Sequence, residues 1–140
     1  MESEVSDSSH YDVFSLNDAM LRGDNIASLK ILHTLQQEGT APFGIVGALM
    51  KDMRALAAAS EAIASGTAPQ AAARFLPAWP KHRPALFQIA LRRLDASQTR
   101  AIIKHISTID MACKGMDKRD PWHLLQDLCL LLCAVPAKVK

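Results

Sequence analysis

The sequence predicts an all-α protein: a single helical bundle of about six or seven helices around one long central helix. Three observations favour this fold class. Hydrophobic residues make up 49% of the 140-residue chain but aromatic residues only 5%, and the abundant alanine and leucine favour helices. Apolar residues recur at intervals of three and four. Glycines and prolines divide these segments where helices end and begin, and no stretch reads as a convincing strand.

The longest predicted helix, residues 41–65, is the expected centre of the bundle. Pro42 fits the first turn of a helix, where a missing N–H costs nothing, and Gly66 fits the position just past the end. About 25 residues correspond to roughly 37 Å of helix. Only four of its side chains are charged, so little of its circumference must face water. The alternative is an ordinary amphipathic helix on the outside of the bundle.

The chain before this helix divides into a linker and two shorter helices. Residues 1–12 are polar and acidic without a period, so we expect a linker or an artificial edge there, as in a fragment of a longer protein, and a helical domain over residues 13–140. Ser15 and Asp18 have the spacing of a capping box for a helix to about Arg22. Asp24 is the expected cap of a helix over residues 25–38, whose apolar stripe comprises Ile26, Leu29, Ile31, Leu32 and Leu35.

Four further helices are expected after Gly66. A short helix over residues 69–76 precedes a proline-rich segment, residues 77–84, that no continuous helix can cross. Helices then follow over residues 82–94 and 96–114, the second capped by Asp95 with Gln98 three residues later. The second has a one-face pattern of Ile102, Ile106, Ile109, Cys113 and Met116.

The last predicted helix begins at Asp120-Pro121, a cap followed by proline, and runs to about Val135. Residues 128–135 contain no polar side chain, although one buried face needs only three or four apolar positions per two turns. Either the domain wraps this helix or one side of it is covered by another subunit. The candidate interface residues are Trp122, Leu124, Leu128, Leu131 and Leu132. The alternative for each is core packing, which we favour for Leu128.

Charge is unevenly distributed along the chain. Residues 1–70 contain nine acidic and four basic residues, whereas residues 71–140 contain five acidic and twelve basic residues. This excess is compatible with a basic face for an acidic partner or with a simple solvated surface, which we favour. The basic candidates are Arg74, Lys81, Arg83, Arg92, Arg93, Arg100, Lys104, Lys114, Lys118 and Arg119. Lys114, Lys118 and Arg119, in the last predicted loop, are the best placed for DNA contact, although no helix-turn-helix signature accompanies them.

No motif points to catalysis. The phosphate-binding patterns GxxxxGK[ST] and GxGxxG are absent, as are CxxC and HExxH. We therefore predict no catalytic residue, no metal ligand and no cofactor, and expect the three cysteines to be reduced, buried thiols of a cytoplasmic protein. No apolar run approaches the 18 or so residues that span a membrane.

Two groups of segments resemble the C-terminal region of the delta subunit of bacterial DNA polymerase III. The first comprises YDVFSLNDAMLRGD, ILHTLQQEG and ALMKDMRAL. The second comprises ALRRLDASQTRAIIKHISTID and, after a Lys-Gly turn, DPWHLLQDLCLLLC. The resemblance covers about residues 11–134 and rests on helical pattern and turn residues.

This resemblance implies a collar domain of the clamp loader, the pentameric AAA+ assembly that places the sliding clamp on primed DNA. It implies partners of the gamma/tau and delta-prime types, with the sliding clamp contacted only through the missing N-terminal region of delta. It also implies that the domain is not an enzyme on its own, since other subunits hydrolyse ATP. Two alternatives stay open: a helical module that contacts DNA non-specifically, and a free-standing regulator that forms a homodimer.

Overall fold

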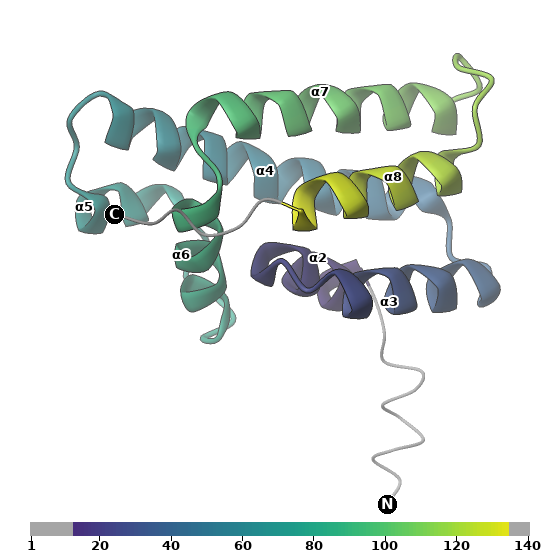
Figure 1. The fold of residues 1–140 in the computed structure, drawn as a ribbon, viewed down its shortest axis with the longest axis horizontal. Coiled ribbons are helices and arrows are strands. Elements are labelled where there is room, and N and C mark those ends of the chain that lie inside the picture. Colours follow the sequence, from purple (N-terminus) through teal and green to yellow (C-terminus); the bar gives the residue numbers. More distant parts are fainter. Residues whose placement is uncertain (1–12, 135–140) are drawn as a thin grey trace, which may run out of the picture.

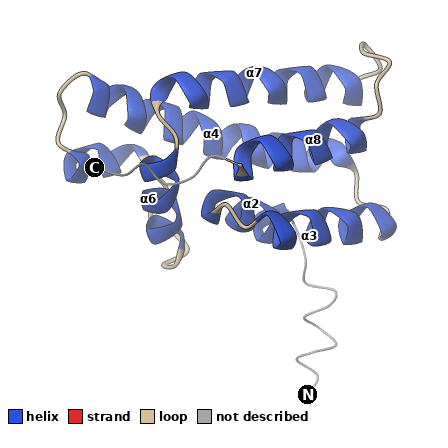
Figure 2. Ribbon diagram, in the orientation of Figure 1, coloured by secondary structure: helices blue, strands red, loops and turns tan. Residues whose placement is uncertain are grey.

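The computed structural model describes residues 13–134, which form a bundle of seven α-helices and one 3₁₀ helix without a β-strand (Figures 1 and 2). This confirms the predicted all-α class. The linker predicted over residues 1–12 lies outside the described residues. The elements are α2 (Val13–Arg22), α3 (Asn25–Gln37), α4 (Pro42–Ala64), α5 (Pro69–Ala72), η1 (Ala73–Phe75), α6 (Arg83–Arg93), α7 (Ala96–Cys113) and α8 (Pro121–Cys133).

Most of the predicted caps are confirmed. The Asp24 carboxylate accepts a hydrogen bond from the Ala27 N–H at 3.0 Å, and Asp95 and Gln98 form a reciprocal capping box. Asp120 accepts from the Trp122 N–H at 3.1 Å. The capping prediction for Ser15 is wrong, because α2 already begins at Val13, whose side chain packs against the core.

Helix α4 is the longest element and packs against α2, α5, η1, α6 and α7. Its inner face buries Ile45, Leu49, Met53 and Leu56 in the common core. Helix α8 packs instead on α2, α3 and α7. Although its composition predicts that little of its circumference faces water, α4 leaves one stripe exposed to solvent, which contains Phe43, Gly47, Lys51 and Arg54.

Three smaller expectations were wrong. Ile26 is exposed because it lies in the first turn of α3, whereas Ser28, Ile31, Leu32 and Leu35 face the core. Met116 is exposed because α7 ends at Cys113 and Gly115, at φ +78°, turns the chain away from the helical path. The helix expected over residues 69–76 is a single α-turn followed by a 3₁₀ turn.

Candidate functional site

A buried ion network joins α2, α4 and α6. The Arg83 guanidinium donates from Nη2 to Asp52 Oδ2 at 2.8 Å and from Nε to Asp18 Oδ1 at 2.9 Å. The Asn17 side-chain amide donates to the same Asp52 oxygen at 3.0 Å. Burial by itself would lower the pKa of Arg83, but the hydrogen bonds and negative charges of Asp52 and Asp18 outweigh it and raise that pKa. Arg83 therefore stays protonated, and its hydrogen bonds tie α6 to α2 and α4 within the domain.

Arg93 is a second buried cation, and it joins the C-terminal ends of two helices. Its guanidinium donates to the carbonyl oxygens of Met20 at 2.9 Å and Leu21 at 3.1 Å, and to that of Leu132 at 2.9 Å. Carbonyls in the last turn of a helix lack an intrahelical partner, and positive charge there is favourable. Burial lowers the pKa of Arg93.

The structure thus removes Arg83 and Arg93 from the basic residues that the sequence offered to an acidic partner. The sequence did carry a signal for their burial. The buried positions of α6 are Arg83, Leu86, Phe87, Ala90 and Arg93, a three-four spacing in which both arginines fall on the apolar face. The sequence alone could not show which acids and carbonyls would pair with them.

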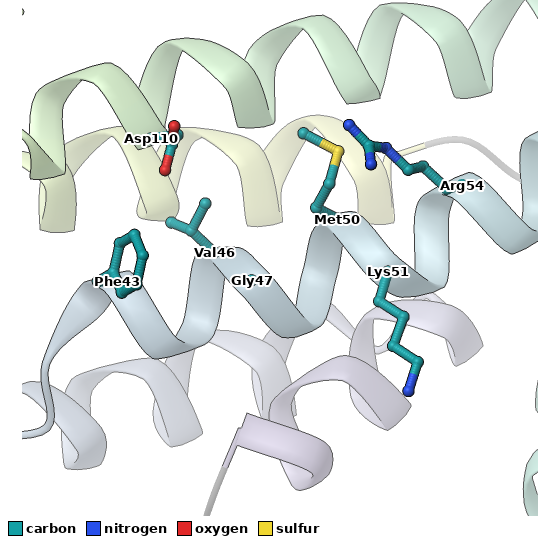
Figure 3. A pocket seen from close by; sticks show the side chains of 7 residues that line it. All are labelled: Phe43, Val46, Gly47, Met50, Lys51, Arg54 and Asp110. Atoms are coloured by element: carbon teal, nitrogen blue, oxygen red, sulfur yellow. The ribbon is translucent and has the colours of Figure 1, made fainter.

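The exposed stripe of α4 forms the floor of a groove. Two adjoining hollows meet along this helix, and Gly47 and Lys51 line both of them. The first hollow, about 440 Å³ in volume, extends along α4 between Phe43 and Arg54 and is bounded by Asp110 of α7 (Figure 3). The second hollow continues toward α2 and the proline-rich segment.

Three exposed aromatic side chains line this groove. Phe43 lies in the first hollow, and Phe14 and Trp79 lie in the second. Phe14 and Phe43 are each 58% exposed and Trp79 is 74% exposed. We call this region the α4 groove, defined by Phe14, Phe43, Gly47, Lys51, Arg54 and Trp79. The sequence did not predict this groove, because the low charge of α4 indicated a central helix with little exposed surface. Phe43, Gly47, Lys51 and Arg54 nevertheless share the spacing of one helical stripe.

The predicted interface residues divide into buried and accessible ones. Leu128 and Leu132 are 1% and 0% exposed inside the domain, so neither offers surface to a partner, and we remove both from the interface set. Trp122 and Leu124 are half-buried against the core. Leu131 is 43% exposed, as is its neighbour Leu130 at 46%, which sequence reasoning did not single out. The domain therefore wraps one side of α8 and leaves two leucines on the other.

The predicted DNA-contact residues lie in or next to the α7–α8 loop, where acids accompany them. Lys114 pairs with Asp110 at 2.9 Å, and Arg119 pairs with Asp117 at 2.7 Å. Hydrogen bonds from Arg119 lower the pKa of Asp117 to about 2. Among the described residues, Lys118 alone of the three candidates forms no ion pair.

The cysteines are three free thiols. Burial is the main cause that raises the pKa of Cys129 to about 12, and it also raises the pKa values of Cys113 and Cys133. These thiols are therefore protonated near neutral pH and are poor nucleophiles. Within residues 13–134, no three histidine, cysteine or carboxylate side chains cluster as metal ligands would.

In the same range of residues, no helix is both long and apolar enough to cross a lipid bilayer.

A family model and a curated relative both match the delta subunit of DNA polymerase III. The family model for the DNA polymerase III delta subunit, C-terminal domain, matches residues 10–130. DNA polymerase III subunit delta of Escherichia coli K12 is 28% identical over 136 residues, which are 97% of this chain and 39% of that protein. This chain therefore spans well under half the length of that relative.

A solved structure shares the fold. The Bacillus subtilis DNA clamp loader delta protein superimposes with a TM-score of 0.60 at 20% sequence identity, over 86% of this chain and 35% of its own. At that identity, the similarity supports the arrangement of helices alone.

Proposed function

This chain belongs to the family of C-terminal domains of the DNA polymerase III delta subunit, and from that premise we propose that it is the assembly domain of a clamp-loader delta subunit. In this role it joins the helical collar of the pentameric loader, beside cytoplasmic subunits of the gamma/tau and delta-prime types. The role is structural and needs no cofactor. Contact with the sliding clamp is assigned to the rest of the delta subunit.

The family match over residues 10–130 is the observation that carries this proposal, because it includes every described helix except the last turn of α8. The surface supports it independently. A member of a ring contacts two neighbours through two different faces, and this bundle exposes large apolar side chains on two faces, one at α4 and one at α8. The α4 and α8 faces lie on opposite sides of the bundle. Figure 1 shows α8 in front of α4, whereas Figure 3 views the bundle from the other side, with α4 in front of α8.

Deletion tests the proposal. The whole gene product and a version lacking residues 13–140 are each mixed with purified gamma/tau-type and delta-prime-type subunits and separated by size-exclusion chromatography. We expect only the whole protein to enter the pentamer. Binding of the truncated protein to the sliding clamp is the control that its remainder is folded. Normal pentamer formation by the truncated protein would contradict the proposal.

Contact with primed DNA is a second candidate function that has less support. Two of its three proposed cations are paired with neighbouring carboxylates, and only Lys118 is left to attract phosphate. Fluorescence anisotropy of primed DNA with micromolar protein at about 50 mM salt tests it, since phosphate contacts are strongest at low salt. The absence of binding there would eliminate the DNA role and leave the assembly role untouched.

A homodimeric regulator, joined through Leu130 and Leu131 of α8, is the third candidate. Sedimentation at high protein concentration separates it from the assembly role: a monomer excludes the homodimer.

A further inference from the structure

We infer that the α4 groove binds an acidic amphipathic helix of a neighbouring subunit. The inference rests on the proposed assembly role and adds to it a particular surface and the chemistry of the partner. Four properties of the groove carry it: its aromatic side chains, its glycine floor, its two exposed cations and its length.

The aromatic side chains are concentrated rather than scattered. Phe14 comes from α2, Phe43 from the start of α4 and Trp79 from the proline-rich segment, yet all three line hollows that share Gly47. Single exposed apolar residues are normal on a protein surface, whereas a contiguous apolar patch marks an interaction site. Phenylalanine and tryptophan are also enriched at protein–protein interfaces.

The glycine at the groove floor has no explanation within this domain. Gly47 lies in the middle of α4 and is not among the glycines with positive φ. A Cβ atom added there would meet no atom within 4 Å. Glycine destabilises a helix interior relative to alanine, so the isolated domain would be better served by alanine. A second backbone that packs closely against α4 would account for the glycine.

The cations of the groove have no carboxylate partner within the part of the chain that the structure describes. Lys51 and Arg54 are exposed and form no ion pair with any residue between 13 and 134. Figure 3 shows Lys51 directed away from α7 and Arg54 directed toward it, so the two side chains extend to opposite sides of the stripe. Asp110, the acid at this edge, is paired with Lys114. A partner with carboxylates on both sides of an apolar stripe complements this pattern.

The length of the groove indicates a helix. From Phe43 to Arg54 is about 16 Å along α4, or three helical turns, the length over which an amphipathic helix presents its apolar anchors to a groove. A nucleic-acid backbone would satisfy the two cations but would leave the aromatic side chains and the glycine floor without contacts.

Binding measurements on variants of the whole gene product test the inference. The variants are the double substitution Lys51→Glu/Arg54→Glu and the substitution Gly47→Leu, which places a bulky side chain in the groove at a position where a Cβ atom meets nothing within 4 Å. Purified gamma/tau-type and delta-prime-type subunits are immobilised separately for biolayer interferometry. We expect each variant to bind at least one of them about tenfold more weakly than the unmodified protein, a loss equal to 1.4 kcal/mol.

The two cations should also make binding depend on salt. The affinity of the unmodified protein for that subunit should fall as salt increases, because salt screens exposed charges, while the affinity of the charge-reversed variant should not. The matched controls are Lys104→Glu and Ala101→Leu, at exposed positions of α7 that do not line the groove. Both should bind like the unmodified protein.

Gly47→Ala distinguishes a binding defect from a folding defect. It should slow amide hydrogen exchange in α4, because alanine stabilises the helix, and still weaken binding by holding the partner backbone further away. A variant that merely damages the fold cannot do both. If charge reversal unfolds the protein, the binding and hydrogen exchange of Gly47→Ala test the inference without the double variant.

The failures of the two proposals are distinguishable. If the unmodified protein binds its partner subunits and all three groove variants bind equally well, the α4 groove is overturned and the assembly role stands. If the unmodified protein binds neither subunit, the assembly role fails and the groove loses its partner.

Discussion

The solvent-facing sides of α4 and α8 both expose large apolar side chains, but they are built in different ways. On α4 the surface is hollowed, with glycine at its floor and two cations beside it. Beneath it lies the ion network of Asp52 and Arg83. On α8 the exposed Leu130 and Leu131 lie in the same turns as the buried Leu128 and Leu132, so the last two turns are apolar on both sides. The first two turns instead expose His123, Gln126 and Asp127.

The difference shows that the interactions beneath a surface determine how that side of the bundle responds to substitution. An ion network holds its members through directional hydrogen bonds, and removing one partner leaves a buried charge. Helix α8 is held by an apolar core, with the Arg93 hydrogen bond to the Leu132 carbonyl at its end. Removing one of its core side chains leaves a cavity. The two faces therefore respond differently to substitution, and the following predictions exploit this, from the largest expected effect to the smallest.

Asp52→Ala should have the largest effect on stability. It leaves the Arg83 guanidinium buried with only part of its pairing, and removal of one partner from a buried ion pair costs about 3–5 kcal/mol. Urea unfolding followed by circular dichroism measures it. The double substitution Asp52→Leu/Arg83→Met is the control, because it removes both charges together and should recover part of the loss, although the buried Asn17 amide then lacks its acceptor. A double variant as unstable as Asp52→Ala would contradict the explanation by unpaired charge.

Leu128→Ala should destabilise the α8 side by about 2–5 kcal/mol, since it leaves a cavity in the core. Leu131→Ala is the matched control on the same helix and should change the free energy of unfolding by less than about 0.5 kcal/mol. The same urea titration measures both. Equal losses at the two positions would show that α8 is not buried on one side as described.

Gly23→Ala tests the clamp by which Arg93 holds α2 to α8. Gly23 has φ +79°, and a Cβ atom there would lie 3.0 Å from Arg93 Cζ. Gly39→Ala is the control, because Gly39 has φ +80° and open space around it. The left-handed backbone alone costs roughly 1–2 kcal/mol in each variant, and displacement of Arg93 should make Gly23→Ala the more unstable in thermal unfolding. Equal losses of stability in the two variants would mean that the Arg93 side chain can move away from residue 23 at no energetic cost.

Titration of Asp117 gives the smallest effect. Hydrogen bonds from Arg119 lower the folded-state pKa of this carboxyl to about 2, below the value of about 3.9 in an unfolded chain. A lowered pKa contributes stability above the unfolded value, and this contribution is lost as the pH falls from about 3.9 toward 2. NMR titration should give a midpoint near 2, and Arg119→Gln should raise it toward 3.9. An unchanged midpoint would show that Arg119 is free of Asp117.

Sequence reasoning recovered the elements better than it recovered the surfaces. Caps such as Asp24, Asp95 and Asp120 act within a few residues, so local sequence predicts them. The partners of Asp52 and Arg93 are 31 or more residues away in the chain, and only the packed fold brings them together. The exposed side of α4 was missed for a related reason. Alanine and glycine occur both on covered and on exposed helix faces, so the composition of α4 does not show whether a neighbouring helix covers them.

Hydrogen exchange of the whole gene product, free and assembled with its partner subunits, tests the account most directly. The account predicts that assembly slows amide exchange in this domain, with protection on the α4 side around residues 43–54. It predicts no protection in a mixture lacking those subunits. Identical amide exchange of residues 13–134 in the free and assembled states would contradict the claim that this domain contacts neighbouring subunits of the loader.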